Sequence, residues 1–210
     1  MSKAFVVGVL GAESTGKTRL AVELRDALVR EGRRVAVVPE FLREFCDAAG
    51  RTPVHREQAE IAAEQTRRID QAAADHDIVI ADTTALMIAV YSELVFGDTS
   101  LYASAIDAHH RCDLTLLTAL DLPWQADGHQ RDGDHVREPV DALVRAALGR
   151  SGMSYSVVGG RGASRLDAAL QAVRHALALP SEEERTASWH WVCERCGDTD
   201  CERHLLPPLA

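Results

Sequence analysis

The chain has 210 residues and a formal net charge of −9, from 23 Lys and Arg against 32 Asp and Glu. Its 46% hydrophobic and 26% charged content is that of a globular protein and excludes collagen-like, mucin-like and wholly disordered chains. The negative charge gives no electrostatic support for binding to nucleic acid or to an anionic membrane. The apolar runs are shorter than the roughly 18 residues that a membrane-spanning helix needs.

Short apolar runs alternate with longer amphipathic segments, which is typical of a parallel sheet covered by helices on both faces. The predicted strands are residues 4–10, 34–38, 78–81, 114–118 and 154–158. The predicted helices are 17–31, which ends at a glycine, 52–75, which opens with Thr-Pro, and 165–179. A polar stretch rich in Asp, Gly and His, residues 121–139, interrupts this rhythm and is expected to be a functional or mobile loop.

The first predicted strand ends in a complete phosphate-binding sequence, G-x-x-x-x-G-K-T. Its glycines allow the backbone to wrap around phosphates, and the N-terminus of the following helix adds its dipole. The lysine places a positive charge at the β- and γ-phosphates, and the threonine hydroxyl is a ligand for Mg²⁺. We therefore predict a P-loop that binds ATP through Gly11, Ala12, Glu13, Ser14, Thr15, Gly16, Lys17 and Thr18.

The third predicted strand ends in Asp82, which completes the four apolar residues and terminal carboxylate of a Walker-B sequence. Such a carboxylate lies at the edge of the sheet where ligands bind, and it holds Mg²⁺. An alternative role is a helix N-cap, because Asp82 and Thr83 also precede a helical stretch, and both roles can hold at once. The sequence T-A-L-D after the fourth strand lacks the lysine of the guanine-binding element of GTPases, which favours ATP.

The second predicted strand leads into the sequence P-E-F-L-R-E-F, which contains Glu40 and Arg43. In kinases of this architecture the acceptor lies above the second and third strands, facing the P-loop. There Glu40 can accept the proton of an acceptor hydroxyl, and Arg43 can anchor acceptor hydroxyls or a phosphate. The alternative is a solvated helix start, where a glutamate suits the helix dipole.

These segments and two later ones together resemble the NadR-like ATPase and kinase family, which includes a ribosylnicotinamide kinase domain. The resemblance covers about residues 4–178 and rests on G-A-E-S-T-G-K-T, P-E-F-L-R-E-F, I-A-D-T-T, D-L-P-W-Q-A-D-G and V-V-G-G-R-G-A-S-R-L. It implies an α/β P-loop NTPase fold of the nucleoside and nucleotide kinase type, with a five-stranded parallel sheet. It also implies ATP- and Mg²⁺-dependent phosphorylation of the 5′-hydroxyl of nicotinamide riboside or a similar nucleoside-like metabolite.

The resemblance also implies residue roles. It carries phosphate binding onto the P-loop and a metal or acceptor carboxylate onto Asp82. The candidate catalytic residues are therefore Lys17, Glu40 and Asp82, together with a lid arginine, for which Arg131 is the candidate. The family reads D-G-x-R here, whereas this chain has one extra residue between the glycine and Arg131. Since the reach of a lid arginine depends on geometry, this departure bears on the rate of turnover. The implied acceptor-binding residues are Glu40, Arg43, Trp124 and Asp127, and Tyr91 is a further candidate for contact with the acceptor.

Physical chemistry supports one part of this assignment. Nicotinamide riboside carries a cationic ring, and the aromatic faces of Tyr91 or Trp124 attract flat cations. Trp124 can equally be a packed hinge after a proline. Gly160 and Arg165 follow the fifth strand, where this architecture often frames the adenine, although a glycine turn before a helix explains them too.

Residues 1–180 are expected to form the kinase-like domain, and residues 181–210 a short appendage rich in Cys and Trp. The appendage holds a Cys₃His set suited to tetrahedral structural zinc, namely Cys193, Cys196, Cys201 and His204. Burial of its two tryptophans is the alternative way to fix this segment. Five cysteines without disulfide spacing suit a reducing cytoplasm.

The sequence leaves two functions open. The first is a cytoplasmic small-molecule kinase with ATP and Mg²⁺, and the alternative is an ATP-dependent, ligand-sensing regulatory ATPase that uses the same pocket. Both bind a small molecule, and for neither do we expect a nucleic-acid or membrane partner. The acceptor and the oligomeric state are not determined by the sequence.

Overall fold

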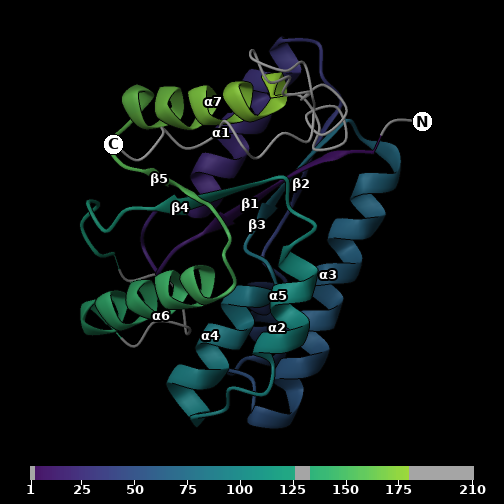
Figure 1. The fold of residues 1–210 in the computed structure, drawn as a ribbon. Helices are drawn as coiled ribbons and strands as arrows, with labels where there is room; N and C mark the ends of the chain where they lie inside the picture. Colours follow the sequence, from purple (N-terminus) through teal and green to yellow (C-terminus); the bar gives the residue numbers. More distant parts are fainter. Residues whose placement is uncertain (1–2, 126–132, 180–210) are drawn as a thin grey trace, which may run out of the picture. The chain divides into compact units, whose positions relative to one another are not determined.

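The computed structural model of the chain describes residues 3–125 and 133–179. A single parallel sheet forms its centre, with the strand order β2-β3-β1-β4-β5 (Figure 1). The strands are β1 Phe5–Leu10, β2 Val35–Val38, β3 Ile78–Asp82, β4 Leu114–Thr118 and β5 Ser156–Val158. All five expected strands are confirmed, and so is the five-stranded parallel P-loop architecture.

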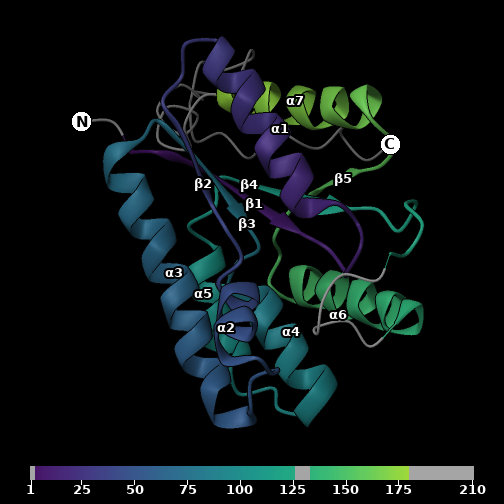
Figure 2. The same ribbon diagram turned by 180° about the vertical axis from the view of Figure 1, so that it is seen from behind.

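Helices cover both faces of this sheet. They are α1 Lys17–Arg30, α2 Phe41–Ala49, α3 Gln58–Asp75, α4 Ala85–Phe96, α5 Tyr102–His109, α6 Arg137–Arg150 and α7 Ala163–Ala178. Figures 1 and 2, drawn from opposite sides, show α1 and α7 on one face and the remaining helices on the other. The buried clusters agree, because α1 and α7 share one apolar cluster while α4 and α6 belong to another. Within the described ranges, no helix is both long and apolar enough to cross a bilayer.

The sequence patterns explain why the core forms where it does. Side chains of the strands alternate between the faces, so Val7 and Val9 pack towards α1 while Val6 and Leu10 join clusters on the other side. Helix α4 is apolar along its first two turns, and the residues from Ala85 to Val90 are all buried. A helix that is apolar all round belongs in the interior of a domain.

One expected helix begins later than predicted. The segment after Thr52 and Pro53 stays extended, a short 3-10 turn covers His55–Glu57, and α3 starts only at Gln58. The physical reason is the Glu57 carboxylate, which accepts a hydrogen bond from the Val54 N–H at 2.8 Å. That contact closes the short turn before α3, so the helix begins after Glu57 and not at the Thr-Pro pair.

The loop predicted over residues 121–139 ends earlier than predicted. A second 3-10 turn, Asp134–Val136, leads directly into α6, which begins at Arg137. Pro139 therefore lies in the first turn of a helix, where its missing N–H leaves no hydrogen bond unmade. The last helix also starts two residues earlier than predicted, at Ala163.

The chain separates into two compact units, Met1–Leu177 and Ala178–Ala210. All five strands belong to the first unit. The proposed zinc ligands Cys193, Cys196, Cys201 and His204 lie outside the described residues, so the zinc site stays a prediction. Among the residues that are described, no group of three or more His, Cys, Asp or Glu is arranged to hold a metal ion.

Candidate active site

The predicted phosphate-binding loop connects β1 to α1, and its backbone is bent at three left-handed positions. Gly11 has φ 146°, Ser14 φ 55° and Gly16 φ 77°. A Cβ on Gly11 would lie 2.0 Å from the Thr118 hydroxyl oxygen, so only glycine fits there. Gly16 occupies the N-cap position of α1 without a side chain to block the N–H groups of the first turn. The loop therefore leaves the start of α1 open to an anion.

Hydroxyl groups hold this loop in its bent form. The Thr15 Oγ1 donates to the Ala12 carbonyl at 2.7 Å, and the Thr118 hydroxyl at the end of β4 donates to Thr15 Oγ1 at 2.7 Å. Both threonine side chains are fully buried. Since buried hydroxyl pairs fix one geometry, the loop is organised without a ligand.

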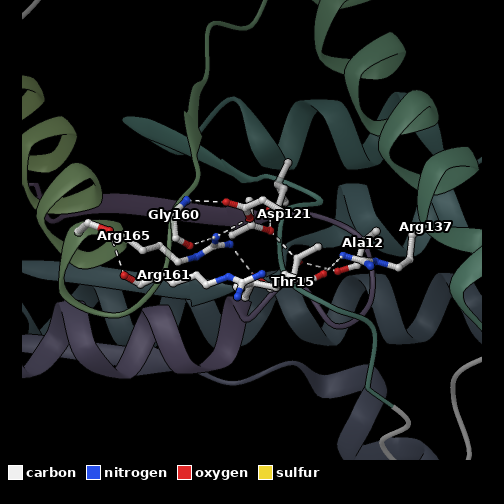
Figure 3. Close-up of polar contacts among 11 residues, drawn as sticks. Ala12, Thr15, Asp121, Arg137, Gly160, Arg161 and Arg165 are labelled. Atoms are coloured by element: carbon white, nitrogen blue, oxygen red, sulfur yellow. Dashed lines mark hydrogen bonds and ion pairs between the residues drawn. The ribbon is translucent and has the colours of Figure 1, made fainter.

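Arg165 attaches the loop to the start of α7 (Figure 3). Its guanidinium donates to the Thr15 carbonyl at 2.6 Å, to the Gly160 carbonyl at 3.1 Å and to Asp121 Oδ1 at 3.0 Å. The Gly160 N–H donates to the other Asp121 oxygen at 2.5 Å. Burial alone would raise the pKa of Asp121, but these hydrogen bonds lower it overall. The predicted residues Gly160 and Arg165 thus lie next to the P-loop, and Arg165 is bound to protein groups there.

The motif lysine, the motif threonine and Asp82 come together at the ends of β1 and β3. Lys17 Nζ donates to the Ala12 carbonyl at 3.0 Å, and Thr18 Oγ1 donates to Asp82 Oδ2 at 2.5 Å. Asp82 is 1% exposed, and its Oδ1 has no hydrogen-bond partner in the described part of the chain. A buried carboxylate oxygen without a partner is costly unless a cation or donor fills the place beside it.

The alternative role for Asp82, as a helix N-cap, is wrong. Thr84 is the N-cap of α4, and its Oγ1 accepts the Leu86 N–H at 3.3 Å. Thr83 between them has φ 72°, a left-handed conformation that separates the end of β3 from the start of α4. Because the cap is supplied elsewhere, the Asp82 carboxylate is left for the site.

Glu40 lies at the end of β2, in the N-cap position of α2, and its side chain makes no capping hydrogen bond. It is 8% exposed, so the solvated helix start considered from the sequence is wrong. Burial raises the pKa of Glu40, opposed by the charge of Lys17 and supported by that of Asp82. Arg43, one turn later, has a guanidinium nitrogen 3.6 Å from Glu40 Oε2. As β2, β3 and β1 are neighbours in that order, Glu40 lies one strand beyond Asp82.

A cavity of about 390 Å³ opens beside these charged groups. Its charged lining comes from Glu13, Lys17, Glu40 and Arg43, and much of its apolar lining comes from the last two turns of α4. Tyr91, predicted from the sequence, is one of the α4 residues that line it. Cys46 lines it too, and burial raises the pKa of this thiol to about 11, so the thiol is protonated at neutral pH.

Trp124, unlike Tyr91, does not line this cavity. It is half-buried, and its Nε1 has no hydrogen-bond partner within the described ranges. Its neighbour Gln125 is joined to the P-loop, because the Ser14 hydroxyl donates to the Gln125 carbonyl at 2.8 Å. The other lid residues, Asp127 and Arg131, lie outside the described residues, and their roles stay predictions.

Arg137 is a residue that the sequence analysis missed. It is the first residue of α6 and 6% exposed, and its guanidinium donates to the Leu122 carbonyl at 2.8 Å and to Asp134 at 3.0 Å. Leu122 in turn packs on the P-loop, since a Cβ on Gly16 would meet Leu122 Cδ1 at 3.1 Å. Figure 3 shows the Arg137 side chain extending towards Ala12. The only sequence signal was an arginine at the start of an amphipathic segment, which is a common arrangement.

Residues 6–165 match the sequence profile of an AAA domain family. The chain belongs to this AAA domain family. A comparison with curated proteins gives no match.

Solved structures of NadR are among those with a similar fold. One is a crystal structure of NadR in complex with NAD and AMP-PNP, at 21% sequence identity and a TM-score of 0.68, covering 85% of this chain. Another is NadR in complex with NR, at 22% identity and a TM-score of 0.68, covering 84% of this chain. The chain spans about half the length of these structures, 51% and 52% respectively. The NadR-like P-loop fold expected from the sequence is confirmed.

Proposed function

We propose that this AAA domain protein is an ATP- and Mg²⁺-dependent kinase that phosphorylates the 5′-hydroxyl of nicotinamide riboside or a similar nucleoside-like metabolite. The observation that carries the proposal is Glu40, a buried carboxylate that lines a cavity together with the P-loop residue Lys17. Similar structures are described with AMP-PNP and with NR, which agrees with a site for a nucleoside triphosphate and a nucleoside.

In this proposal the P-loop binds the triphosphate. The N–H groups at the start of α1 and the ammonium of Lys17 face the β- and γ-phosphates. Lys17 donates to the Ala12 carbonyl, and it exchanges this contact for a phosphate oxygen when ATP binds. The contacts of Arg165 and Thr118 hold the loop in shape, so little order is lost on binding.

Thr18 and Asp82 fit a magnesium ion. Both offer hard oxygen atoms, they lie 2.5 Å apart, and the buried Asp82 Oδ1 has no partner among the described residues. Bound there, Mg²⁺ would neutralise charge on the β- and γ-phosphates. The protein's own part is to hold the Asp82 carboxylate in place and to shield it from water.

Glu40 is the proposed general base. The acceptor hydroxyl attacks the γ-phosphorus, its proton passes to the Glu40 carboxylate, a new P–O bond forms, and the bond to the bridging oxygen breaks so that ADP leaves. Burial raises the pKa of Glu40, which makes the carboxylate a stronger base than an exposed glutamate. Arg43, 3.6 Å from Glu40, orients the carboxylate or an acceptor hydroxyl.

The aromatic ring of Tyr91 suits the cationic ring of the proposed acceptor. Arg131 is the proposed lid arginine. Arg137 donates to the Leu122 carbonyl, beside the P-loop. An arginine near the transferring group stabilises its developing charge.

The experiment is ADP release measured with ATP, Mg²⁺ and a panel of nucleosides, including nicotinamide riboside. A kinase releases one ADP for each acceptor molecule that it phosphorylates, and it releases little ADP when no acceptor is added. Slow hydrolysis that is indifferent to every acceptor would contradict the proposal and favour the ligand-sensing ATPase.

A further inference from the structure

Gln65 is a buried amide that holds the backbone on both sides of Glu40. It lies on α3 and is fully buried. Its Oε1 accepts the Phe41 N–H at 2.7 Å, and its Nε2 donates to the Pro39 carbonyl at 3.3 Å. Phe41 is the first residue of α2, so its N–H is one of those that a helix leaves without a partner at its start. One side chain therefore fixes both the residue before Glu40 and the residue after it.

The same amide reaches the residue that follows Asp82. Gln65 Nε2 also donates to the Thr83 carbonyl at 3.3 Å. Thr83 has φ 72°, which is unfavourable for a β-branched residue and persists only where neighbouring contacts impose it. The Thr83 N–H donates to the Val9 carbonyl at 3.0 Å, and Gln65 holds the carbonyl side of the same residue.

These contacts lie where the sheet no longer joins the two strands. The parallel pairing of β2 with β3 ends at Val38 and Ala81, and Glu40 and Asp82 come after this pair. The hydrogen bonds between these two strands therefore do not set the separation of the two carboxylate-bearing segments. Gln65 supplies a link between the segments beyond the end of the ladder.

We propose that Gln65 is a positioning residue that fixes Glu40 relative to Asp82, and thereby aligns the acceptor hydroxyl with the γ-phosphate. An amide offers an acceptor oxygen and two N–H donors, so one glutamine can hold an N–H and two carbonyls at once. A misplacement of about 1 Å in a reacting group can cost on the order of 10²-fold in rate. This inference rests on the proposed function and adds a residue that acts on the reaction without touching the substrate.

The test compares the wild type with Gln65→Met, which keeps the length of the side chain and removes its hydrogen bonds to the three backbone groups. Gln65→Asn, which keeps the amide but shortens its reach, replaces it if Gln65→Met does not fold. Thr66→Val is the matched control, because the Thr66 hydroxyl donates to the Ala62 carbonyl of the same helix at 3.0 Å. Val173→Ala is the control for stability, because it removes buried methyl groups from α7 on the opposite face of the sheet (Figures 1 and 2).

Three measurements are made on each variant. ADP release with ATP, Mg²⁺ and nicotinamide riboside gives kcat and KM. The rise in Tm with AMP-PNP and Mg²⁺ reports nucleotide binding without turnover. Hydrogen–deuterium exchange of residues 39–45 and 82–86 reports how firmly the two segments are held.

Gln65→Met should lower kcat by about 10- to 100-fold, while KM for ATP stays within about threefold and the rise in Tm with AMP-PNP is kept. Exchange should become faster in residues 39–45 and 82–86 of this variant and in neither control. The inference is overturned if a folded Gln65 variant keeps the wild-type kcat or the wild-type exchange of these segments. It is also overturned if Val173→Ala loses as much kcat at a similar loss of Tm.

The exchange measurement separates this inference from the proposed function. If the wild type releases ADP without any dependence on acceptor, the proposed kinase activity is contradicted. Faster exchange of residues 39–45 in Gln65→Met would then still support Gln65 as the residue that holds the Glu40 segment, and unchanged exchange would overturn both.

Discussion

Replacing Glu40 with Gln keeps the size and most of the shape of a buried side chain and removes its ability to accept a proton. General-base catalysis contributes about 10²–10⁴-fold in rate, or about 3–5 kcal/mol of barrier at 1.36 kcal/mol per tenfold. A loose phosphoryl-transfer transition state needs the base more for orientation than for proton removal, which favours the lower end. We therefore expect kcat to fall by about 10²-fold, with the affinity for ATP nearly unchanged.

The same substitution should stabilise the fold. Burial raises the folded-state pKa of Glu40 above its ordinary value, so its ionised form is disfavoured by folding. The contribution of protonated Glu40 to the free energy of unfolding is fully present at pH values below its pKa in the unfolded state. That contribution is lost as the pH rises through its pKa in the folded state. At neutral pH the charge is a cost that Gln avoids, and Tm should rise as activity falls. In the wild type, the acidic limb of kcat/KM should lie above the ordinary glutamate pKa of about 4.3.

The assay is steady-state ADP release across pH, with thermal unfolding of the same samples. Glu44→Gln is the matched control, because Glu44 lies on α2 but is exposed and paired with Arg68 at 2.5 Å. The reasoning is refuted if Glu40→Gln turns over like the control, or if its loss of activity is rescued by higher Mg²⁺. That second result would exchange the roles of Glu40 and Asp82.

Three further substitutions test the phosphate side of the site. Asp82→Asn should weaken the response to Mg²⁺, with activity partly restored by higher metal concentration; a loss of kcat that metal does not restore would count against the magnesium role. Lys17→Ala should abolish the rise in Tm produced by an ATP analogue while the unliganded Tm stays near wild type, and a normal rise would remove the lysine from the phosphate site. Arg165→Leu deletes the contact to the Thr15 carbonyl and should raise KM for ATP by about 10-fold, which titration of ADP release checks; an unchanged KM would mean that the loop holds its shape without α7.

The sequence was sufficient for those parts of the site that depend on chain order. A glycine-rich loop after one strand and a carboxylate after another predict Lys17, Thr18 and Asp82 at one sheet edge, and the structure joins Thr18 to Asp82. The sequence also predicts Glu40 at the end of the second strand, and the structure places it there, one strand beyond Asp82. These relations follow from topology, because the carboxyl ends of parallel strands share an edge.

The sequence was not sufficient for properties that arise from packing. Whether Glu40 is buried depends on the helices around it, and nothing in its own segment distinguishes a buried from a solvated helix start. Gln58 and Arg137 are ordinary polar residues at helix starts until the fold buries them to 4% and 6% exposure. The start of α3 was misplaced for a similar reason, since the Glu57 contact that turns the chain competes with the Thr-Pro signal.

The most direct test of the proposed kinase activity is the fate of the γ-phosphoryl group. Wild-type protein is incubated with ATP, Mg²⁺ and nicotinamide riboside, and the riboside and nucleotide products are quantified together by mass spectrometry. The proposed function predicts a riboside heavier by one phosphoryl group, formed one-to-one with ADP and absent in Glu40→Gln at short times. ADP that accumulates with inorganic phosphate, while the riboside keeps its mass, would contradict it.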